Sequence, residues 1–92
     1  MGILTMQSVE NEIRQFIIDN FLFGASGDGL SVDDSLIDKG LIDSTGVLEL
    51  VAFLQTTYTF QIEDHEIVPD NLDSIGKIAR FVQGKNSGLN QK

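Results

Sequence analysis

The first quarter of the chain has apolar residues at the spacing of one face of an α-helix. They recur at intervals of three and four residues, at Val9, Ile13, Phe16, Ile17 and Phe21. Ser8 directly precedes this row and is a candidate N-cap, because a serine hydroxyl accepts a hydrogen bond from a free N–H of the first turn. Three glycines between residues 24 and 29 interrupt the pattern, so a first helix is predicted before them.

A long acidic loop is predicted from these glycines to Asp43. Its apolar residues have no regular period and are interpreted as separate anchors to a core: Leu30, Val32, Leu36, Ile37, Leu41 and Ile42. A loop of this length is unusual unless it packs through its own side chains or serves a function.

The clearest predicted element is a second helix. Five apolar residues lie at helical spacing and predict its buried stripe: Val47, Leu48, Val51, Leu54 and Tyr58. Asp43 or Ser44 is the natural cap at its start. The run from Thr56 to Thr59 is β-branched and aromatic, which weakens a helix, so the helix is predicted to end there.

Shorter elements are predicted after the second helix. Phe60 and Ile62 alternate with polar neighbours, which favours a short extended segment. Residues 63–68 are predicted to form a brief helical turn that Pro69 closes. A proline also biases the residue before it, here Val68, away from helical backbone angles.

A last helix is predicted from Ser74 to Val82. Its apolar row is Ile75, Ile78, Ala79 and Val82. The residues after Gly84 are polar and expected to be flexible. Together the elements predict an all-α fold, a small three-to-four-helix bundle with a long loop between the first and second helices. We expect one domain over residues 8–83, between a flexible N-terminus of residues 1–7 and a flexible tail of residues 84–92.

The charge of the chain narrows the choice of partners. The formal net charge is -8 over 92 residues, so nucleic acid is an unfavourable partner because its phosphates would be repelled. Eleven of the fourteen acidic residues lie between Asp28 and Asp73, where Lys39 is the only Lys or Arg. Such a segment can steer association with basic partner surfaces, or it can simply keep the protein in solution.

The residue inventory predicts that the chain does not catalyse a reaction on its own. There is no cysteine, which excludes a disulfide, a thiolate nucleophile and a cysteine metal ligand. His65 is the single histidine, and no serine lies in a G-x-S-x-G turn. The acidic loop lacks the EF-hand spacing, and the glycines do not lead into a phosphate-binding helix with lysine.

The chain is expected to be a cytoplasmic protein. No apolar run approaches the ~18 residues needed to span a membrane. The N-terminus lacks the basic start and apolar run of a signal peptide.

The order of elements and one stretch of sequence resemble the acyl carrier protein family, which includes the aminoacyl and peptidyl carriers. The stretch is G-L-I-D-S-T-G-V-L-E-L-V at residues 40–51, followed by N-L-D-S-I-G-K-I-A-R-F-V at residues 71–82. The resemblance runs from about Val9 to Val82.

The resemblance implies a covalent cofactor on one serine. In the family, a serine that follows an aspartate at the start of the second helix carries 4′-phosphopantetheine through a phosphodiester, and the matching residue is Ser44. The terminal thiol of that arm would bear an acyl or aminoacyl group as a thioester. Asp43 would help to hold the Mg²⁺ of the phosphopantetheinyl transferase. A helix N-terminus favours an attached phosphate through its free N–H groups and its dipole.

Two other Asp-Ser pairs compete with Asp43-Ser44. Asp34-Ser35 is followed by Leu36, which spells the commonest triplet of the family, but no helical stripe follows it. Ser35 is therefore interpreted as a loop residue that lets its apolar neighbours pack. Ser74 opens the last helix and is interpreted as its cap.

The resemblance also implies partner enzymes: the transferase, a ligase that loads the acyl or aminoacyl group, and a downstream synthase or transferase of fatty acid, polyketide or nonribosomal peptide synthesis. We expect the carrier to act as a monomer. Residues of the second helix are predicted to recognise these partners: Thr45, Glu49, Leu50 and Phe53. Leu50 and Phe53 have two possible roles, since they either form an apolar contact surface or pack inward.

The chain departs from the family pattern directly after Ser44. Thr45 replaces the usual leucine, and Gly46 replaces an acidic or polar residue. Glycine in a first turn costs a helix up to ~1 kcal/mol relative to alanine. A glycine at this position is also typical of carriers for D-alanine and other amino acids, so the cargo stays open.

A groove beside the second helix is predicted to shelter a short acyl chain. Its expected lining is apolar: Val47, Val51, Phe60, Ile62 and Ile67. A long chain would need a larger cavity than a domain of this size keeps open. The alternative function is an unmodified acidic adaptor that binds partner proteins through the same helix.

Overall fold

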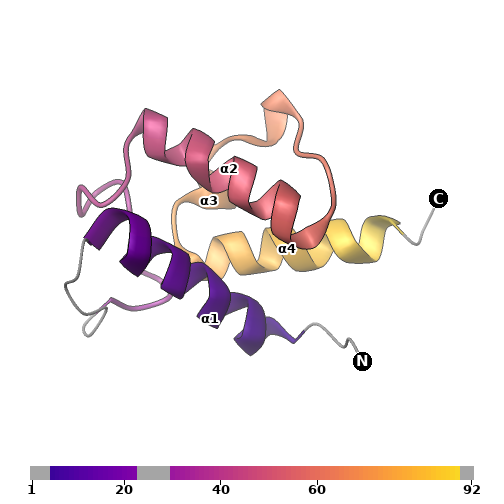
Figure 1. The fold of residues 1–92 in the computed structure, drawn as a ribbon, viewed down its shortest axis with the longest axis horizontal. Helices are drawn as coiled ribbons and strands as arrows, with labels where there is room; N and C mark the ends of the chain where they lie inside the picture. Colours follow the sequence, from indigo (N-terminus) through magenta and orange to yellow (C-terminus); the bar gives the residue numbers. More distant parts are fainter. Residues whose placement is uncertain (1–4, 23–29, 90–92) are drawn as a thin grey trace.

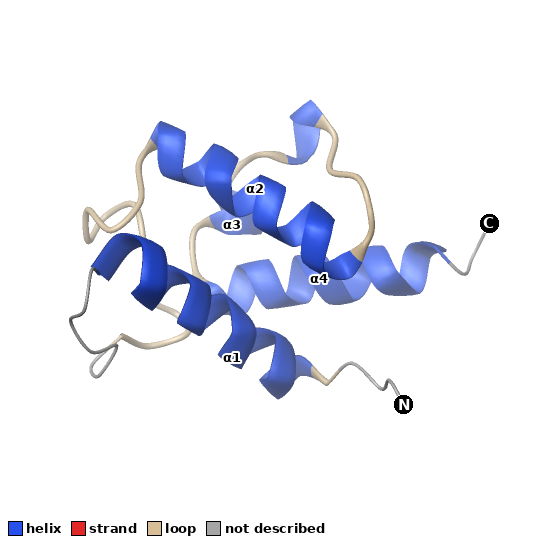
Figure 2. Cartoon of the chain, in the orientation of Figure 1, coloured by secondary structure: helices blue, strands red, loops and turns tan. Residues whose placement is uncertain are grey.

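The computed structural model describes residues 5–22 and 30–89, and in this part of the chain all regular structure is helical (Figure 2). The elements are α1 (Met6–Ile17), the π-helical turn η1 (Ile18–Leu22), α2 (Ser44–Tyr58), the 3₁₀ turn η2 (Asp64–Glu66), α3 (Pro69–Leu72) and α4 (Ile75–Leu89). The predicted all-α bundle is confirmed. No helix in the described ranges is both long and apolar enough to cross a membrane.

Helix α1 begins before the residue that the sequence pattern indicated. Thr5 is the N-cap, and its Oγ1 accepts a hydrogen bond of 3.0 Å from Ser8 N. The prediction of Ser8 as cap is therefore wrong, because Ser8 lies inside the first turn and serves as the donor. The predicted apolar row of α1 is confirmed: Val9, Ile13 and Ile17 are fully buried, and Phe16 and Phe21 pack against the core.

The end of η1 and the start of α2 lie at the same end of the bundle (Figure 1). Helices α1 and α2 run in opposite directions there, and α4 packs against α1 and α3. The loop contributes Leu30, Leu36 and Ile42 to the core, as predicted. Ile37 is different, because 46% of its surface is exposed, so its prediction as a buried anchor is wrong.

Helix α2 is capped by Asp43, whose Oδ1 accepts a hydrogen bond of 2.8 Å from Gly46 N. It ends at Tyr58 because Thr59 has a left-handed backbone (φ 62°), and the predicted end is confirmed. The buried face carries Gly46, Leu50, Val51 and Leu54. Leu48 is 61% exposed, so its place in the predicted stripe is wrong. Leu48 and Leu50 are two residues apart and therefore lie on nearly opposite sides of a helix.

Tyr58 joins the end of α2 to α1. Its hydroxyl donates a hydrogen bond of 2.5 Å to Glu12 Oε1. Partial burial and the neighbouring Glu12 carboxylate both disfavour a phenolate, so the pKa of Tyr58 is raised well above its ordinary value.

The segment after α2 is partly as predicted. Phe60 and Ile62 are buried in non-helical backbone, and Ile62 N donates to Gln55 Oε1 over 2.8 Å. Val68 is extended, as expected before a proline. Pro69 does not close a helical turn but begins α3 at its first position. This position suits proline, since a first-turn N–H has no intrahelical partner.

Helix α4 is capped by Ser74, whose Oγ accepts a hydrogen bond of 3.1 Å from Lys77 N, as predicted. The helix continues through Leu89 and so passes the predicted end at Val82. One reason is a tertiary contact in this last part: Lys85 Nζ donates to Glu66 Oε1 over 2.8 Å. Of the predicted tail, residues 90–92 lie outside the described residues.

The Glu66–Lys85 pair gives a prediction for the pH dependence of stability. The hydrogen bond from Lys85, with that from Glu63 N, lowers the pKa of Glu66 below its ordinary 4.5. A lowered folded-state pKa adds stability above the unfolded-state value and loses it as the pH falls through the folded-state value. We expect Lys85→Gln to cost about 0.2–1 kcal/mol at neutral pH, and the cost to shrink in acid, as measured by urea unfolding.

The matched control for this prediction is Lys39→Gln. Lys39 Nζ lies 3.9 Å from Asp34 Oδ2, and its side chain is 48% exposed, compared with 24% for Lys85. We expect no measurable change of stability from it at any pH. A pH-independent effect of Lys85→Gln would contradict the assignment to Glu66.

Candidate functional site

Ser44 is the first residue of α2, and its side chain is exposed. The cap contacts around it belong to Asp43, which accepts from Gly46 N through its carboxylate and from Val47 N through its carbonyl over 2.8 Å. Within residues 5–22 and 30–89, the Ser44 hydroxyl has no hydrogen-bond partner. The Ser44 hydroxyl is therefore available for covalent modification.

The other two serines of the Asp-Ser pairs use their hydroxyls in the fold. Ser35 Oγ donates to Asp73 Oδ2 over 2.6 Å and accepts from Asp38 N over 3.0 Å. Ser74 is 3% exposed and caps α4. Asp73 belongs to the third Asp-Ser pair, so the first and third pairs bind each other. The pair at the start of α2 takes no part in this contact.

The start of α2 fits an attached phosphate. The N–H groups of Ser44 and Thr45 belong to the first turn, where no intrahelical acceptor exists, and the helix dipole adds partial positive charge. Asp43 uses Oδ1 as the cap, which leaves Oδ2 without a partner in the described part of the chain. A hydroxyl, two N–H groups and a carboxylate oxygen thus lie together at one helix end.

Gly46 allows the start of α2 to lie close to η1, which follows α1. A Cβ atom on Gly46 would lie 2.8 Å from Ile42 Cγ1 and 2.9 Å from Phe21 Cε1. Both distances are shorter than the van der Waals contacts that Cβ atoms make in proteins. Phe21 packs edge-on against Phe16, with ring centroids 5.7 Å apart. The departure from the family pattern at Gly46 therefore has a packing reason.

The residues predicted to recognise partners do not all reach the surface. Thr45 and Glu49 are exposed, whereas Leu50 is fully buried, so Leu50 packs inward. Phe53 is half-buried and stacks on Phe16 with ring centroids 4.3 Å apart. The exposed apolar residue of α2 is Leu48, which the sequence pattern did not identify. The signal for this is a row of residues with a spacing of four, Gly46, Leu50 and Leu54. If this row is taken as the buried face, Leu48 lies on the exposed face.

A polar hollow lies beside Ser44 on the α1 side of α2. It has a volume of about 600 Å³ and is lined by Asn20, Phe21, Gly40, Leu41, Asp43, Thr45, Gly46 and Glu49. Asp43, Thr45 and Glu49 are thus brought to one surface. No three His, Cys, Asp or Glu side chains within the described ranges form a group that could hold a metal ion.

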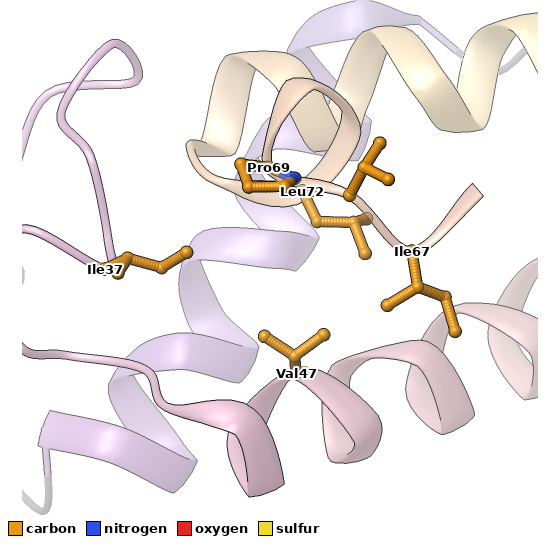
Figure 3. A pocket seen from close by; sticks show the side chains of 6 residues that line it. Ile37, Val47, Ile67, Pro69 and Leu72 are labelled. Carbon is orange, nitrogen blue, oxygen red and sulfur yellow. The ribbon is translucent and has the colours of Figure 1, made fainter. Parts of the chain in front are cut away.

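An apolar pocket lies on the other side of α2 (Figure 3). It has a volume of about 80 Å³ and is lined by Ile37, Val47, Ile67, Val68, Pro69 and Leu72. Of the predicted groove residues, Val47 and Ile67 line it. The other three do not line this pocket and are buried in the core: Val51, Phe60 and Ile62.

Comparison with known proteins gives relatives named acyl carrier protein and D-alanyl carrier protein. No protein-family model matches the chain. The acyl carrier protein of Chlamydia trachomatis serovar D is 25% identical over 80 residues, which cover 87% of this chain and 99% of that protein. The serovar L2 protein of the same name is 26% identical over 76 residues, 83% of this chain and 94% of its own length. The D-alanyl carrier protein of Streptococcus pyogenes serotype M5 is 31% identical over 52 residues, 56% of this chain and 66% of that protein.

Proposed function

We propose that this chain, which belongs to the acyl carrier protein family, bears an acyl or aminoacyl group as a thioester on a 4′-phosphopantetheine arm attached to Ser44. The observation that carries the proposal is the free, exposed hydroxyl of Ser44 at the start of α2, while Ser35 and Ser74 use theirs in the fold. The arm supplies the terminal thiol that this cysteine-free chain lacks.

The attachment is a phosphoryl transfer to Ser44. The hydroxyl gives up its proton, an Oγ–P bond forms, and the bond between that phosphorus and the nucleotide of the donor breaks. The N–H groups of the first turn would stabilise the phosphodiester charge. We place the second carboxylate oxygen of Asp43 on the Mg²⁺ of the phosphopantetheinyl transferase, since its first oxygen caps the helix.

The loaded carrier would meet its partners on the exposed side of α2. Thr45 and Glu49 are exposed there, and Leu48 adds an apolar contact. The partners we propose are the transferase, a loading ligase and a downstream synthase or transferase, all acting in the cytoplasm. The relatives named D-alanyl carrier protein support an amino acid as the alternative cargo.

Intact mass spectrometry after treatment with a phosphopantetheinyl transferase and coenzyme A tests the attachment site. We expect the wild-type chain to gain the mass of one phosphopantetheine. Ser44→Ala is expected to lose this gain completely while its free energy of unfolding stays within about 0.5 kcal/mol, because the side chain is exposed and its hydroxyl makes no hydrogen bond within the described residues. Ser35→Ala and Ser74→Ala are expected to keep the gain, since their hydroxyls are engaged elsewhere.

The outcome also separates the carrier from the alternative function. A folded wild-type chain that stays unmodified with several transferases would reject the carrier proposal and favour an acidic adaptor. Modification that persists in Ser44→Ala but disappears in Ser35→Ala or Ser74→Ala would move the arm to that other serine.

A further inference from the structure

The apolar pocket begins one helical turn from Ser44. Val47 lies three residues after Ser44 on α2 and lines the pocket, so the two residues lie on neighbouring parts of one helix face. The opposite wall comes from the loop at Ile37 and from Pro69 and Leu72 of α3 (Figure 3). A cargo tethered to Ser44 therefore has an apolar cavity within its reach.

The size and lining of the pocket limit what it can hold. Its volume is about 80 Å³. An apolar cavity of about 150 Å³ holds benzene, so a cavity of half that volume accommodates roughly three or four carbon atoms. All six lining side chains are apolar, so a charged group would lose its hydration there without gaining a partner. The fitting occupant is the end of a short, uncharged acyl chain.

Ile37 is held at one wall of this pocket by contacts that do not bury it. Its side chain is 46% exposed, while its backbone N–H donates to Asp73 Oδ1 over 3.0 Å. The second oxygen of the same carboxylate accepts from Ser35 Oγ over 2.6 Å. Leu36 N donates to the Asp73 carbonyl over 2.7 Å. Three hydrogen bonds thus fix the loop to the junction between α3 and α4.

This arrangement gives the contact between the first and third Asp-Ser pairs a role, which is to position Ile37. Burial alone would account for Leu36, which is fully buried, but it does not account for an apolar side chain kept at the surface one residue later. Figure 3 shows the Ile37 side chain extending toward the space between Val47 and Pro69. A wall in that position shortens the cavity.

We propose that Ile37 sets the length of the acyl chain that this carrier shelters, at roughly four carbons, and that Asp73 and Ser35 are the residues that position it. The proposal rests on the proposed function, since the chain must be tethered to Ser44. It assigns a short acyl group to the pocket and leaves the polar hollow on the other side of α2 without an occupant.

The test uses transferase loading from acyl-coenzyme A, which attaches arm and cargo together. Acetyl, butyryl, hexanoyl, octanoyl and alanyl forms are compared by the methyl NMR shifts of Val47, Ile67 and Leu72 and by the rate at which hydroxylamine cleaves the thioester. In the wild-type chain we expect butyryl to shift these methyl signals and slow cleavage. Octanoyl and alanyl forms are expected to behave like the arm alone.

Variants at Ile37 carry the decisive comparison. Ile37→Ala removes three carbon atoms from the wall, so the longest sheltered chain should grow by about two to three carbons. Ile37→Phe should abolish shelter of butyryl. Because Ile37 is 46% exposed, the larger side chain should not prevent folding. Lys39→Gln is the control in the same loop, since the Lys39 side chain is 48% exposed and does not line the pocket. It should keep the wild-type length profile.

Variants at Asp73 test the positioning role. Asp73→Ala removes both side-chain acceptors, so the length profile should broaden toward that of Ile37→Ala. Asp73→Asn keeps an oxygen for Ile37 N and gains an N–H that can donate to Ser35 Oγ, so it should restore the wild-type profile. A residue that only stabilised the fold would lower the melting temperature without moving the profile.

The possible results separate the inference from the function it rests on. If no arm is attached to Ser44, the proposed function fails. If loading succeeds but the length profile is the same in wild type, Ile37→Ala and Ile37→Phe, the role of Ile37 fails and the carrier function stands. Equal shelter of octanoyl or alanyl groups by the wild-type chain would likewise overturn the length limit.

Discussion

Replacement of Leu50 by alanine is expected to lower the free energy of unfolding by about 2–5 kcal/mol. Leu50 has no exposed surface and lies on the buried face of α2 with Gly46 and Leu54. Loss of its side chain removes apolar contacts and leaves a cavity that the surrounding helices fill only in part. Urea unfolding followed by circular dichroism measures the change.

Leu48→Ala is the control with the same chemical change on the same helix. Leu48 is 61% exposed, so its truncation should change the free energy of unfolding by no more than about 0.5 kcal/mol. The same substitution should weaken partner contacts if Leu48 lies on the docking surface. A larger loss of stability from Leu48→Ala than from Leu50→Ala would mean that α2 is rotated about its axis relative to this structure.

Substitution of alanine for Gly46 is expected to destabilise the protein by about 1–3 kcal/mol, although alanine is the better helix former. The new methyl group would lie less than 3 Å from Ile42 and Phe21. Ile42 is buried and the Phe21 ring packs against Phe16, so neither can move aside freely. Thermal and urea unfolding measure the loss.

Gly84→Ala is the matched control for Gly46→Ala. Gly84 lies in α4 with an exposed surface, and a Cβ added there would have no atom within 4 Å. Without a clash, the helix propensity of alanine should stabilise the protein by up to about 1 kcal/mol. Opposite signs for the two variants would identify packing as the reason for Gly46. Stabilisation by both would show that Phe21 can move at little cost.

Periodicity was sufficient to predict α1 and the location of α2, but not the orientation of α2. The α1 row of Val9, Ile13 and Ile17 stands among polar residues, so one face is unambiguous. Helix α2 has apolar residues on most sides, and the spacing rule accepts Leu48 as readily as Leu50. The choice depends on η1, whose Phe21 lies against Gly46. That contact has no signature in the spacing of α2 itself.

The remaining errors have the same tertiary origin. The apolar row predicts that the last helix ends at Val82, whereas the helix continues through Leu89 and Lys85 contacts Glu66 in this last part. Pro69 was interpreted as a terminator, although proline also suits the first position of a helix.

The site was predicted in part. The helix behind Asp43 distinguished Ser44 from the other serines, and the free hydroxyl in the structure supports that choice. The wall of the pocket at Ile37 was not foreseen, because Asp73 positions it from another part of the chain. The position of Ile37 in the pocket wall depends on this tertiary contact, which the local sequence around Ile37 does not indicate.

The contact between Ser35 and Asp73 has a consequence for the order in which the protein folds. The two residues are 38 positions apart, and a contact of such separation closes late because the chain must first lose the entropy of a large loop. During synthesis, α1 and the sequence of α2 leave the ribosome before Asp73 does. In the proposed function, the attachment residue Ser44 thus leaves the ribosome before Asp73, whose carboxylate accepts the hydrogen bond from Ile37 N. A nascent chain would gain its attachment point before it gains its shelter.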